Sequence, residues 1–245
     1  MIDAMVVTEV GMLNDVERLH TISNNLANSN TVGFKKEISV SRPFMDYLES
    51  APASRLFGTS TAVARPQYAT TTDHTAGTLK HTGNPLDLAL EGDGYFVLAA
   101  EGGDFYTRQG SFRIDGSGRL IGSGGIPVAG VSGDIQLTIP DPRIDQRGVV
   151  WEGNTEVGQI RVVRVVNPDS LVKLGVGMFA GTESTELSEM DLAHVRQGFA
   201  ETANVVAMNE MIKMIETVRH FEASQKLVRS YDTMLDRGIN LVGEL

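Results

Sequence analysis

The chain has 245 residues, of which 41% are hydrophobic, and it carries a formal net charge of −10. This composition is enough for a sizeable buried core and excludes a generally disordered chain, while the negative charge argues against a nucleic-acid backbone or an anionic bilayer as the main partner. The absence of cysteine excludes disulfides and thiolate metal sites.

The N-terminal segment predicts an amphipathic helix over residues 2–26. Its first residues lack a basic region and a long apolar run, so we expect no cleaved secretory signal. No run of about 18 apolar residues occurs, so we expect no membrane span. Six of eight positions spaced alternately three and four residues apart are apolar, which is typical of a coiled-coil stripe. The eight positions are Ile2, Met5, Glu9, Met12, Val16, Leu19, Ser23 and Leu26.

An asparagine-rich stretch, NNLANSNTVGFKK, occupies residues 24–36 at the end of this helix. Asparagine is a weak helix former whose short amide can bond backbone groups, so the stretch predicts the end of a packed helix. Gly33 supplies the freedom for a positive φ that a sharp exit needs, and Phe34 is the expected apolar anchor. We assign residues 1–30 to an N-terminal helix and residues 31–80, rich in Thr, Ser, Ala and Gly, to an extended connector.

The centre of the chain, residues 81–197, predicts a β-rich domain. Glycine-rich turn signals separate short alternating or apolar runs there, which is typical of hairpins. The expected strands cover residues 86–90, 95–99, 105–108, 111–114, 120–121, 135–139 and 159–166.

The C-terminal segment, residues 198–245, predicts a second and longer amphipathic helix with Thr202 as a candidate N-cap. A helix of roughly 40 residues is about 60 Å long. Nine of eleven positions at the same alternating spacing are apolar. These positions are Ala207, Met211, Met214, Val218, Phe221, Gln225, Val228, Asp232, Leu235, Ile239 and Val242. The two terminal stripes must be buried against each other, against other subunits, or both. The expected fold is therefore α+β, with long terminal amphipathic helices that form a coiled-coil layer, an extended connector and a β-rich central domain.

The residues do not assemble an enzyme site. The five histidines, at positions 20, 74, 81, 194 and 220, form no HxH or HExxH pair. Asp87, Glu91 and Asp93 flank a glycine turn, where carboxylates are common for backbone reasons. Residues 175–180 match a dinucleotide pattern, but no apolar helix follows them. We therefore expect no catalytic residue, no cofactor and no metal.

Four segments resemble, in the same order, those of the flagellar axial proteins, the rod and hook family. The first is the stretch at residues 24–36, which fills every fixed position of the family's N-terminal signature. The others are GNPLDLALEGDGYFVL at 83–98, YTRQGSFRIDGSGRL at 106–120 and the C-terminal segment at 201–235. Ordered agreement over both ends and the centre is far more specific than any single motif.

This resemblance implies a structural subunit of the flagellar basal-body rod. The moderate length and the segment at residues 126–141 favour the short proximal-rod type, with the distal-rod or hook types as alternatives. Rod proteins are exported by the flagellar type III apparatus and polymerise through their terminal helices into the periplasmic drive shaft that carries torque to the hook. The implied partners are copies of the chain, other rod proteins, axial proteins on the hook side and the base side, and the export apparatus, with no nucleic acid and no direct membrane span.

The expected assembly residues lie in the Asn-rich stretch and on the two stripes. They are Asn24, Asn25, Leu26, Ala27, Asn28, Thr31, Gly33, Phe34, Met12, Val16, Leu19, Asn204, Met211, Met214, Val218, Phe221, Val228, Leu235 and Ile239. Two other classes of function stay open on the residues alone. One is a binding module that dimerises through its terminal helices, and the other is an enzyme that uses the carboxylates near Gly92.

Overall fold

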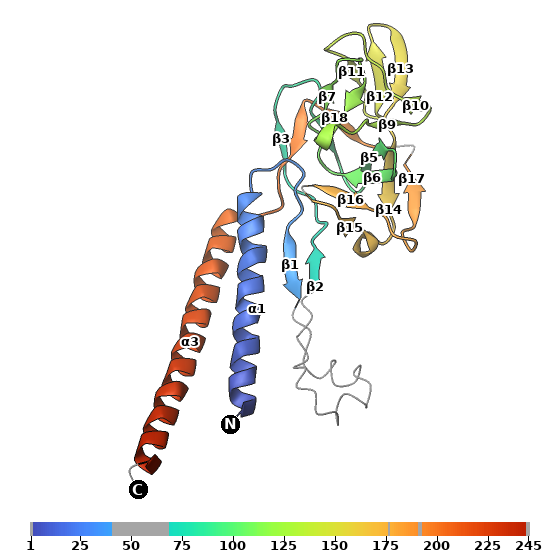
Figure 1. Ribbon diagram of the computed structural model, residues 1–245. Helices are drawn as coiled ribbons and strands as arrows, with labels where there is room; N and C mark the ends of the chain where they lie inside the picture. The colour runs from blue at the N-terminus through green and yellow to red at the C-terminus, as the bar shows by residue number, and fades with distance from the viewer. Residues whose placement is uncertain (1, 41–68, 176, 191–192, 244–245) are drawn as a thin grey trace. The chain divides into compact units, whose positions relative to one another are not determined.

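A computed structural model describes residues 2–40, 69–175, 177–190 and 193–243, and the chain folds as two compact units (Figure 1). Unit 1 contains both ends of the chain and comprises residues 1–26, 37–71 and 206–245. Unit 2 comprises residues 27–36 and 72–205. Part of the expected connector, residues 41–68, lies outside the described residues. No helix in the described part is both long enough and apolar enough to cross a membrane.

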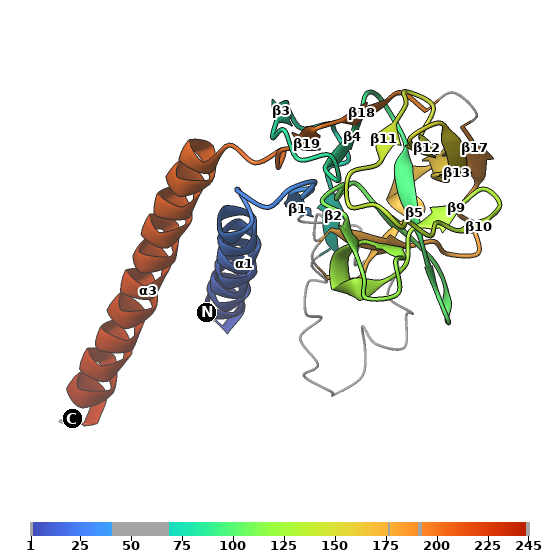
Figure 2. The same ribbon diagram turned by 90° about the horizontal axis from the view of Figure 1, so that it is seen from above.

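Unit 1 is built on two long helices and a small sheet. Helix α1 spans Ile2–Ala27 and helix α3 spans Ala207–Gly243. Strand β1, Glu37–Val40, pairs with strand β2, Ala69–Thr72. Figures 1 and 2 show α1 and α3 side by side from two directions.

The start of α3 corrects the proposed N-cap. The helix begins at Ala207, and the carbonyl oxygen of Val206 accepts hydrogen bonds from the backbone N–H groups of Asn209 and Glu210. Thr202 instead follows a strand, and its hydroxyl oxygen accepts a hydrogen bond from the Thr78 N–H at 3.2 Å. The residues before it pair with an earlier strand, and this tertiary pairing overrides the local capping preference.

Unit 2 is a β-rich domain in which every strand pair is antiparallel. Its largest sheet has six strands in the order β15-β16-β6-β5-β14-β17. These strands are β15 Val172–Lys173, β16 Met178–Ala180, β6 Gly103–Thr107, β5 Tyr95–Ala100, β14 Val162–Val165 and β17 Leu187–Glu189. A second sheet has three strands, β11 Arg143–Ile144, β12 Val149–Glu152 and β13 Thr155–Gln159.

Four two-stranded pairs complete this unit. They are β3 Leu79–His81 with β19 Phe199–Glu201, β4 Leu88–Leu90 with β18 Val195–Gln197, β7 Arg113–Ile114 with β8 Leu120–Ile121, and β9 Ala129–Gly130 with β10 Gly133–Asp134. Two short 3₁₀ turns, η2 Ser123–Gly125 and η3 Pro168–Ser170, lie in the connections. In the first two pairs, strands β18 and β19, which precede α3 in the chain, pair with β4 and β3 from the earlier part of unit 2.

The core of unit 2 lies on both faces of strand β5. Because successive side chains on a strand point to opposite faces, Phe96 and Leu98 enter one buried cluster while Tyr95 and Val97 enter another. Phe96 is fully buried and meets Phe112 edge to face, with ring centroids 5.1 Å apart. The strand is therefore covered on both sides.

The α+β class, with a helix at each end and a β-rich centre, is confirmed. The expected strand at residues 159–166 is divided, because β13 pairs with β12 while β14 pairs with β5, and the chain changes partners at Ile160 and Arg161. The expected strand at residues 135–139 is wrong. Ile135 and Leu137 are buried there, but residue 136 makes only an isolated bridge.

Replacing Phe96 with alanine is expected to lower the free energy of unfolding of unit 2 by about 3–5 kcal/mol, because a buried ring is lost and a cavity remains. Denaturant unfolding followed by the fluorescence of Trp151, the single tryptophan, measures the change. Val131→Ala is the control, since Val131 is 62% exposed, and it should cost less than about 0.5 kcal/mol. Equal decreases in the free energy of unfolding of the two variants would contradict the assignment of Phe96 to the core.

Candidate assembly interface

The two helices of unit 1 present a seam of partly or fully covered residues with heptad spacing. On α1 these residues are Thr8, Met12, Asp15, Leu19, Ile22 and Leu26, and on α3 they are Glu210, Met214, Thr217, Phe221, Ser224, Val228 and Tyr231. The expected stripes share Met12, Leu19 and Leu26 with the first set, and Met214, Phe221 and Val228 with the second. At the alternate positions the covered residue lies one place earlier in the chain than expected.

On the first part of α3, this one-residue difference places polar side chains in the seam and apolar ones outside it. Glu210, Thr217 and Ser224 are buried, whereas their neighbours Met211 and Val218 are exposed. The hydroxyl of Thr217 donates to the carbonyl oxygen of Lys213 at 2.8 Å. Polar residues of α3 can therefore be covered because they find partners, and apolar residues are left at the surface.

Polar contacts between described side chains join α1 to α3. The Nδ1 atom of His220 lies 2.6 Å from Oδ2 of Asp15. The amide of Asn25 donates to Oε2 of Glu210 at 3.4 Å, and Lys213 bonds the other carboxylate oxygen at 2.7 Å. Directional pairs of this kind can fix the register of two helices at some cost in stability.

Asn25 also holds the first strand. Its Nδ2 atom donates to the carbonyl oxygen of Glu37 at 2.8 Å, and its Oδ1 atom accepts from the Glu37 N–H at 2.9 Å. The neighbouring Asn24 donates to the Glu37 carboxylate at 3.4 Å. The buried Asn25 amide therefore bonds both backbone groups of Glu37, as a neighbouring strand would. The high asparagine content predicted such a backbone contact but not which asparagine makes it.

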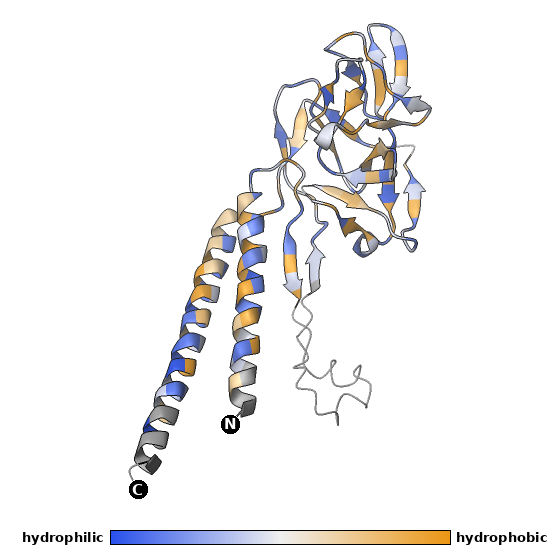
Figure 3. Ribbon diagram, viewed as in Figure 1, coloured by the Kyte–Doolittle hydropathy of each residue, from blue (hydrophilic) through white to orange (hydrophobic). Residues whose placement is uncertain are grey.

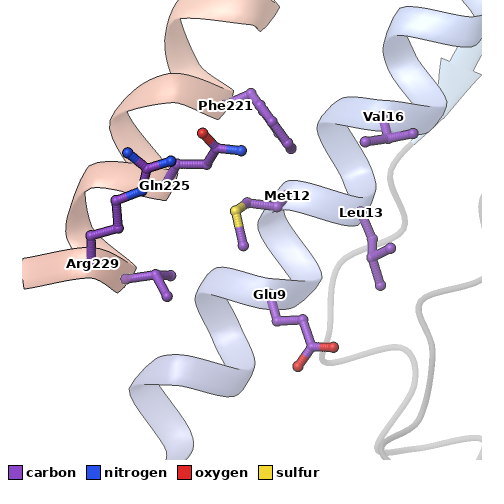
Figure 4. A pocket seen from close by; sticks show the side chains of 8 residues that line it. Glu9, Met12, Leu13, Val16, Phe221, Gln225 and Arg229 are labelled. Atoms are coloured by element: carbon purple, nitrogen blue, oxygen red, sulfur yellow. The ribbon is translucent and has the colours of Figure 1, made fainter. Parts of the chain in front are cut away.

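An open groove of about 390 Å³ lies between α1 and α3 (Figure 4). Its apolar lining is Met12, Leu13, Val16, Phe221 and Val228. Glu9, Gln225 and Arg229 provide the polar lining. Leu13 and Val16 remain exposed, so the helix pair does not close over its own apolar surface here.

A second apolar surface lies on the first part of α3, where Figure 3 shows hydrophobic residues concentrated. We call it the α3 patch, and it consists of Met208, Met211, Ile212, Ile215 and Val218, all exposed. At 100° per residue these positions occupy a different face of the helix from the seam. An exposed apolar surface of this kind is a candidate interaction site.

The remainder of the Asn-rich stretch, residues 27–36, belongs to unit 2. Gly33 has a φ of +65°, as predicted, and a Cβ there would lie 2.5 Å from the backbone carbonyl of Arg108. Phe34 is buried with 1% exposure, and the Lys173 ammonium lies 4.2 Å from its ring centroid. Before this turn, the N–H of Thr31 donates to the carbonyl oxygen of Asn28 at 3.0 Å.

Asn204 connects this stretch to the chain preceding α3. Its Oδ1 atom accepts from the Lys36 N–H at 2.7 Å, and its backbone N–H donates to the carbonyl oxygen of Phe34 at 3.3 Å. Its Nδ2 atom donates to the carbonyl oxygens of Asp73 and Thr75. Of the remaining expected residues, Ala27 ends α1, while Leu235 and Ile239 lie on α3 with side chains outside the described part.

A buried carboxylate, Glu201, lies at the centre of unit 2's contacts with this stretch. Lys35 Nζ lies 2.6 Å from Oε1 and Arg108 Nη1 lies 3.3 Å from Oε2, and all three side chains are at least 96% buried. The N–H of Gly77 also donates to Oε1 at 2.8 Å, and Lys35 donates to the Thr75 carbonyl oxygen at 2.7 Å. Burial lowers the pKa of Lys35, and the Glu201 carboxylate opposes that shift.

Four sequence segments meet at this cluster. Lys35 comes from the Asn-rich stretch, Arg108 from residues 106–120 and Glu201 from the C-terminal segment. Arg108 also donates to the carbonyl oxygen of Gly92, within residues 83–98, at 2.8 Å. Sequence reasoning missed all three charged residues. The signal in the sequence was that a lysine, an arginine and a glutamate each lie inside a separate segment that resembles the family.

The three carboxylates near Gly92 that an enzyme site would use each have a polar partner within unit 2. Glu91 pairs with Arg196 at 2.9 Å, and Asp93 pairs with Arg164 at 3.1 Å. Asp87 accepts a hydrogen bond from Asn84 at 3.1 Å. Among the described residues, no group of three or more His, Asp or Glu could hold a metal ion.

Comparison with known families gives three matches in chain order. Residues 11–35 match the flagella basal body rod protein family, and residues 89–157 match the flagellar hook protein FlgE/F/G D1 domain. Residues 196–241 match the flagellar basal body rod FlgEFG protein C-terminal region. The first and last matches contain Lys35 and Glu201.

Full-length relatives carry two names. A flagellar basal-body rod protein FlgF from Caulobacter vibrioides is 32% identical over 93% of this chain and 92% of its own length. A FlgG protein from Bacillus subtilis is 31% identical over 94% of this chain and 96% of its own. A FlgG protein from Buchnera aphidicola is 30% identical over 97% and 98%.

Replacing Lys35 with methionine is expected to lower the free energy of unfolding of unit 2 by about 3–5 kcal/mol, because Glu201 loses its closest charge partner inside the protein. The adjacent Lys36 is the matched control. It pairs with Asp73 at 3.1 Å near the surface, so Lys36→Met should cost at most about 1 kcal/mol. Denaturant unfolding measures both, and similar values for the two variants would contradict the buried-charge assignment.

The stability of unit 2 is expected to fall as the pH drops below about 6.5. His74 lies 2.7 Å from the Tyr95 hydroxyl, and burial lowers the pKa of His74. The unfolded chain therefore binds more protons than the folded chain as the pH falls through the ordinary histidine range, so the free energy of unfolding decreases, by at most about 1.4 kcal/mol per pH unit.

His74→Gln should remove this pH dependence, and His194→Gln, at an exposed histidine, should retain it. Denaturant unfolding between pH 5 and 7.5 compares the three proteins. A slope that persists unchanged in His74→Gln would assign the effect to another group.

Proposed function

The chain belongs to the flagellar basal-body rod protein family, and we propose that its copies polymerise through their terminal helices into the rod that carries torque across the periplasm. Membership rests on relatives at least 30% identical over more than nine tenths of the chain. The family is one of structural proteins of the basal body. Assembly with other rod and axial proteins follows from the family, and no reaction is proposed.

The α3 patch is the observation that carries the polymerisation proposal. Met208, Ile212 and Ile215 are at least half exposed, and burying the exposed part of each side chain would gain roughly 1–2 kcal/mol. Within unit 1 the apolar groove between α1 and α3 lies on another face of α3. A patch and a groove that differ from each other form a heterologous contact, which continues into a helical filament instead of closing into a dimer.

The same contact explains how the assembly would carry torque. If the α3 patch of one copy enters the interhelix groove of the next, the terminal helices form a coiled-coil layer with heptad-spaced contacts. Interlocked side chains at regular spacing resist sliding and rotation of one helix past another. Asn24, Asn25, Leu26 and the other expected residues at the end of α1 would then hold this layer to the strand that follows.

The route and the subtype are further parts of the proposal. Export by the flagellar type III apparatus is proposed from family membership, and so is the export apparatus as a partner. We propose a FlgF-like proximal-rod subunit, with a FlgG-like distal-rod or hook-type subunit as the alternative. The segment at residues 126–141 and the moderate length favour the former, and the identities of 32% and 31% to named FlgF and FlgG proteins are too close to favour either.

Ile215→Lys is expected to abolish or reduce motility by at least about tenfold without unfolding the chain. Ile215 is 55% exposed, so the free energy of unfolding should change by less than about 0.5 kcal/mol, whereas a buried, unpaired ammonium in the subunit contact costs several kcal/mol. Swimming assays of cells with the variant as their only copy, and counts of complete rods in isolated basal bodies, measure the effect.

Glu216→Lys, at an exposed position one residue further along α3, provides a control for an added lysine outside the patch. Normal motility of cells with Ile215→Lys would contradict the proposed contact between the α3 patch and a neighbouring copy. A purified chain that forms one discrete, stable dimer, instead of monomers and polydisperse assemblies, would favour the dimeric binding module.

A further inference from the structure

Unit 2 contains an open groove that is lined by three arginines. Arg143 lies on β11, Arg147 lies in the turn between β11 and β12, and Arg196 lies on β18. The groove has a volume of about 720 Å³, and Phe199 contributes an aromatic ring to its lining. The guanidinium of Arg196 lies 5.7 Å from the centroid of that ring. Positive charge is concentrated here on a chain whose net charge is −10.

The local carboxylates do not neutralise this groove. Asp145 is the one acidic residue in the lining, and its Oδ1 atom already accepts the N–H groups of Arg147 and Val149. Its Oδ2 atom is 3.8 Å from the Arg147 guanidinium, a distant pair with an exposed arginine. Glu91 pairs with Arg196. Among the described residues, Arg143 has no ion-pair partner. Three guanidinium groups therefore face two carboxylates, Asp145 and Glu91, and the groove retains one excess positive charge.

A complementary acidic segment lies elsewhere on the same unit. Residues 183–189 carry Glu183, Glu186 and Glu189, and all three are exposed. Glu189 is held by Arg161 at 2.6 Å, whereas Glu183 and Glu186 have no ion-pair partner in the described part of the chain. The segment includes β17, which is an edge strand of the six-stranded sheet, and Leu187 within it is 40% exposed.

The groove and the acidic segment are separate surfaces of unit 2. Strand β17 pairs only with β14, while β11 and β18 pair with β12 and β4, and Figure 1 shows β17 apart from β11 and β18. Two different complementary surfaces on one unit make a heterologous contact between copies, which does not close on itself. Charge complementarity of this kind sets which surfaces meet and in which register.

We propose that the arginine groove binds residues 183–189 of a second copy of this chain, with Arg143 and Arg147 facing Glu183 and Glu186. This contact would tie the β-rich units of neighbouring subunits together, in addition to the contact made by the helices. The proposal rests on the proposed function only in requiring that copies assemble. It assigns that assembly a second, salt-sensitive interface outside the terminal helices.

The absence of cysteine permits a direct test. Gln146→Cys places a thiol in the groove lining and Ser188→Cys places one in the acidic segment, both at exposed positions that leave every charge unchanged. The two full-length single-cysteine variants are mixed at high protein concentration and treated with a short bismaleimide. The expected result is a cross-linked pair of one Gln146→Cys and one Ser188→Cys chain, in excess over cross-linked pairs of identical variants.

Charge reversal then decides whether the arginines are responsible. Adding Arg143→Glu and Arg147→Glu to the Gln146→Cys chain should lower the cross-link yield about tenfold, and adding Glu183→Arg and Glu186→Arg to the Ser188→Cys chain should do the same. Combining the two reversed chains should restore the yield. Arg113→Glu, at an exposed arginine on β7 outside the groove, should leave it unchanged.

Sedimentation of the same samples separates the two proposals. Assembly without the mixed cross-link overturns the groove contact and leaves the helix contact standing. If the samples show no assembly and no cross-link, both the helix contact and the groove contact are contradicted. A cross-link that survives charge reversal also overturns the groove proposal, and loss of yield after addition of sulfate at constant ionic strength would assign the groove to small anions instead.

Discussion

The buried carboxylate of Glu201 is the constraint on which the arrangement of unit 2 depends. A charge inside a protein is tolerated only when opposite charges and hydrogen-bond donors surround it. Lys35, Arg108 and the N–H of Gly77 meet that requirement. Each comes from a different part of the sequence, so satisfying one carboxylate fixes the relative positions of the first stretch of unit 2, the strands at its centre and its last strand, β19.

The close packing around this charge explains the glycines beside it. A Cβ on Gly33 would lie 2.5 Å from the Arg108 carbonyl, and one on Gly77 would lie 1.9 Å from the carbonyl oxygen of Thr202. Backbone must approach backbone at both points so that Glu201 can be enclosed. Asn204 then adds five hydrogen-bond contacts to residues 34, 36, 73 and 75 through its backbone N–H, its Oδ1 and its Nδ2. The hydrogen bonds and ion pairs of Glu201 and Asn204 therefore set the positions of residues 33–36 and 73–77 more than the burial of apolar surface does.

The sequence was sufficient for the elements with a long or strong period. It predicted α1 almost to its ends, the body of α3, and the strands whose residues alternate between two buried clusters, such as β5. It was insufficient where tertiary pairing decides: Thr202 has a capping residue's chemistry, yet the preceding residues pair with β3. At alternate positions, the covered residues of the seam lie one place earlier in the chain than the expected apolar stripes. The stripes were chosen by hydropathy alone, which does not consider the hydrogen bonds that allow polar side chains to be buried. Glu210 and Thr217 are buried with partners, and no apolar template would have selected them.

The composition of the seam determines where the terminal helices can gain stability. Helix α3 has 37 residues and α1 has 26, so α1 cannot cover the whole of its partner. Where they meet, Asp15, Glu210, Thr217 and Ser224 are buried, and burying such groups returns little net free energy. The five apolar side chains of the α3 patch remain exposed within a single chain. In the proposed assembly, burial of that surface by a neighbouring copy would contribute more than pairing within the chain does, and these helices would gain their full stability only on assembly.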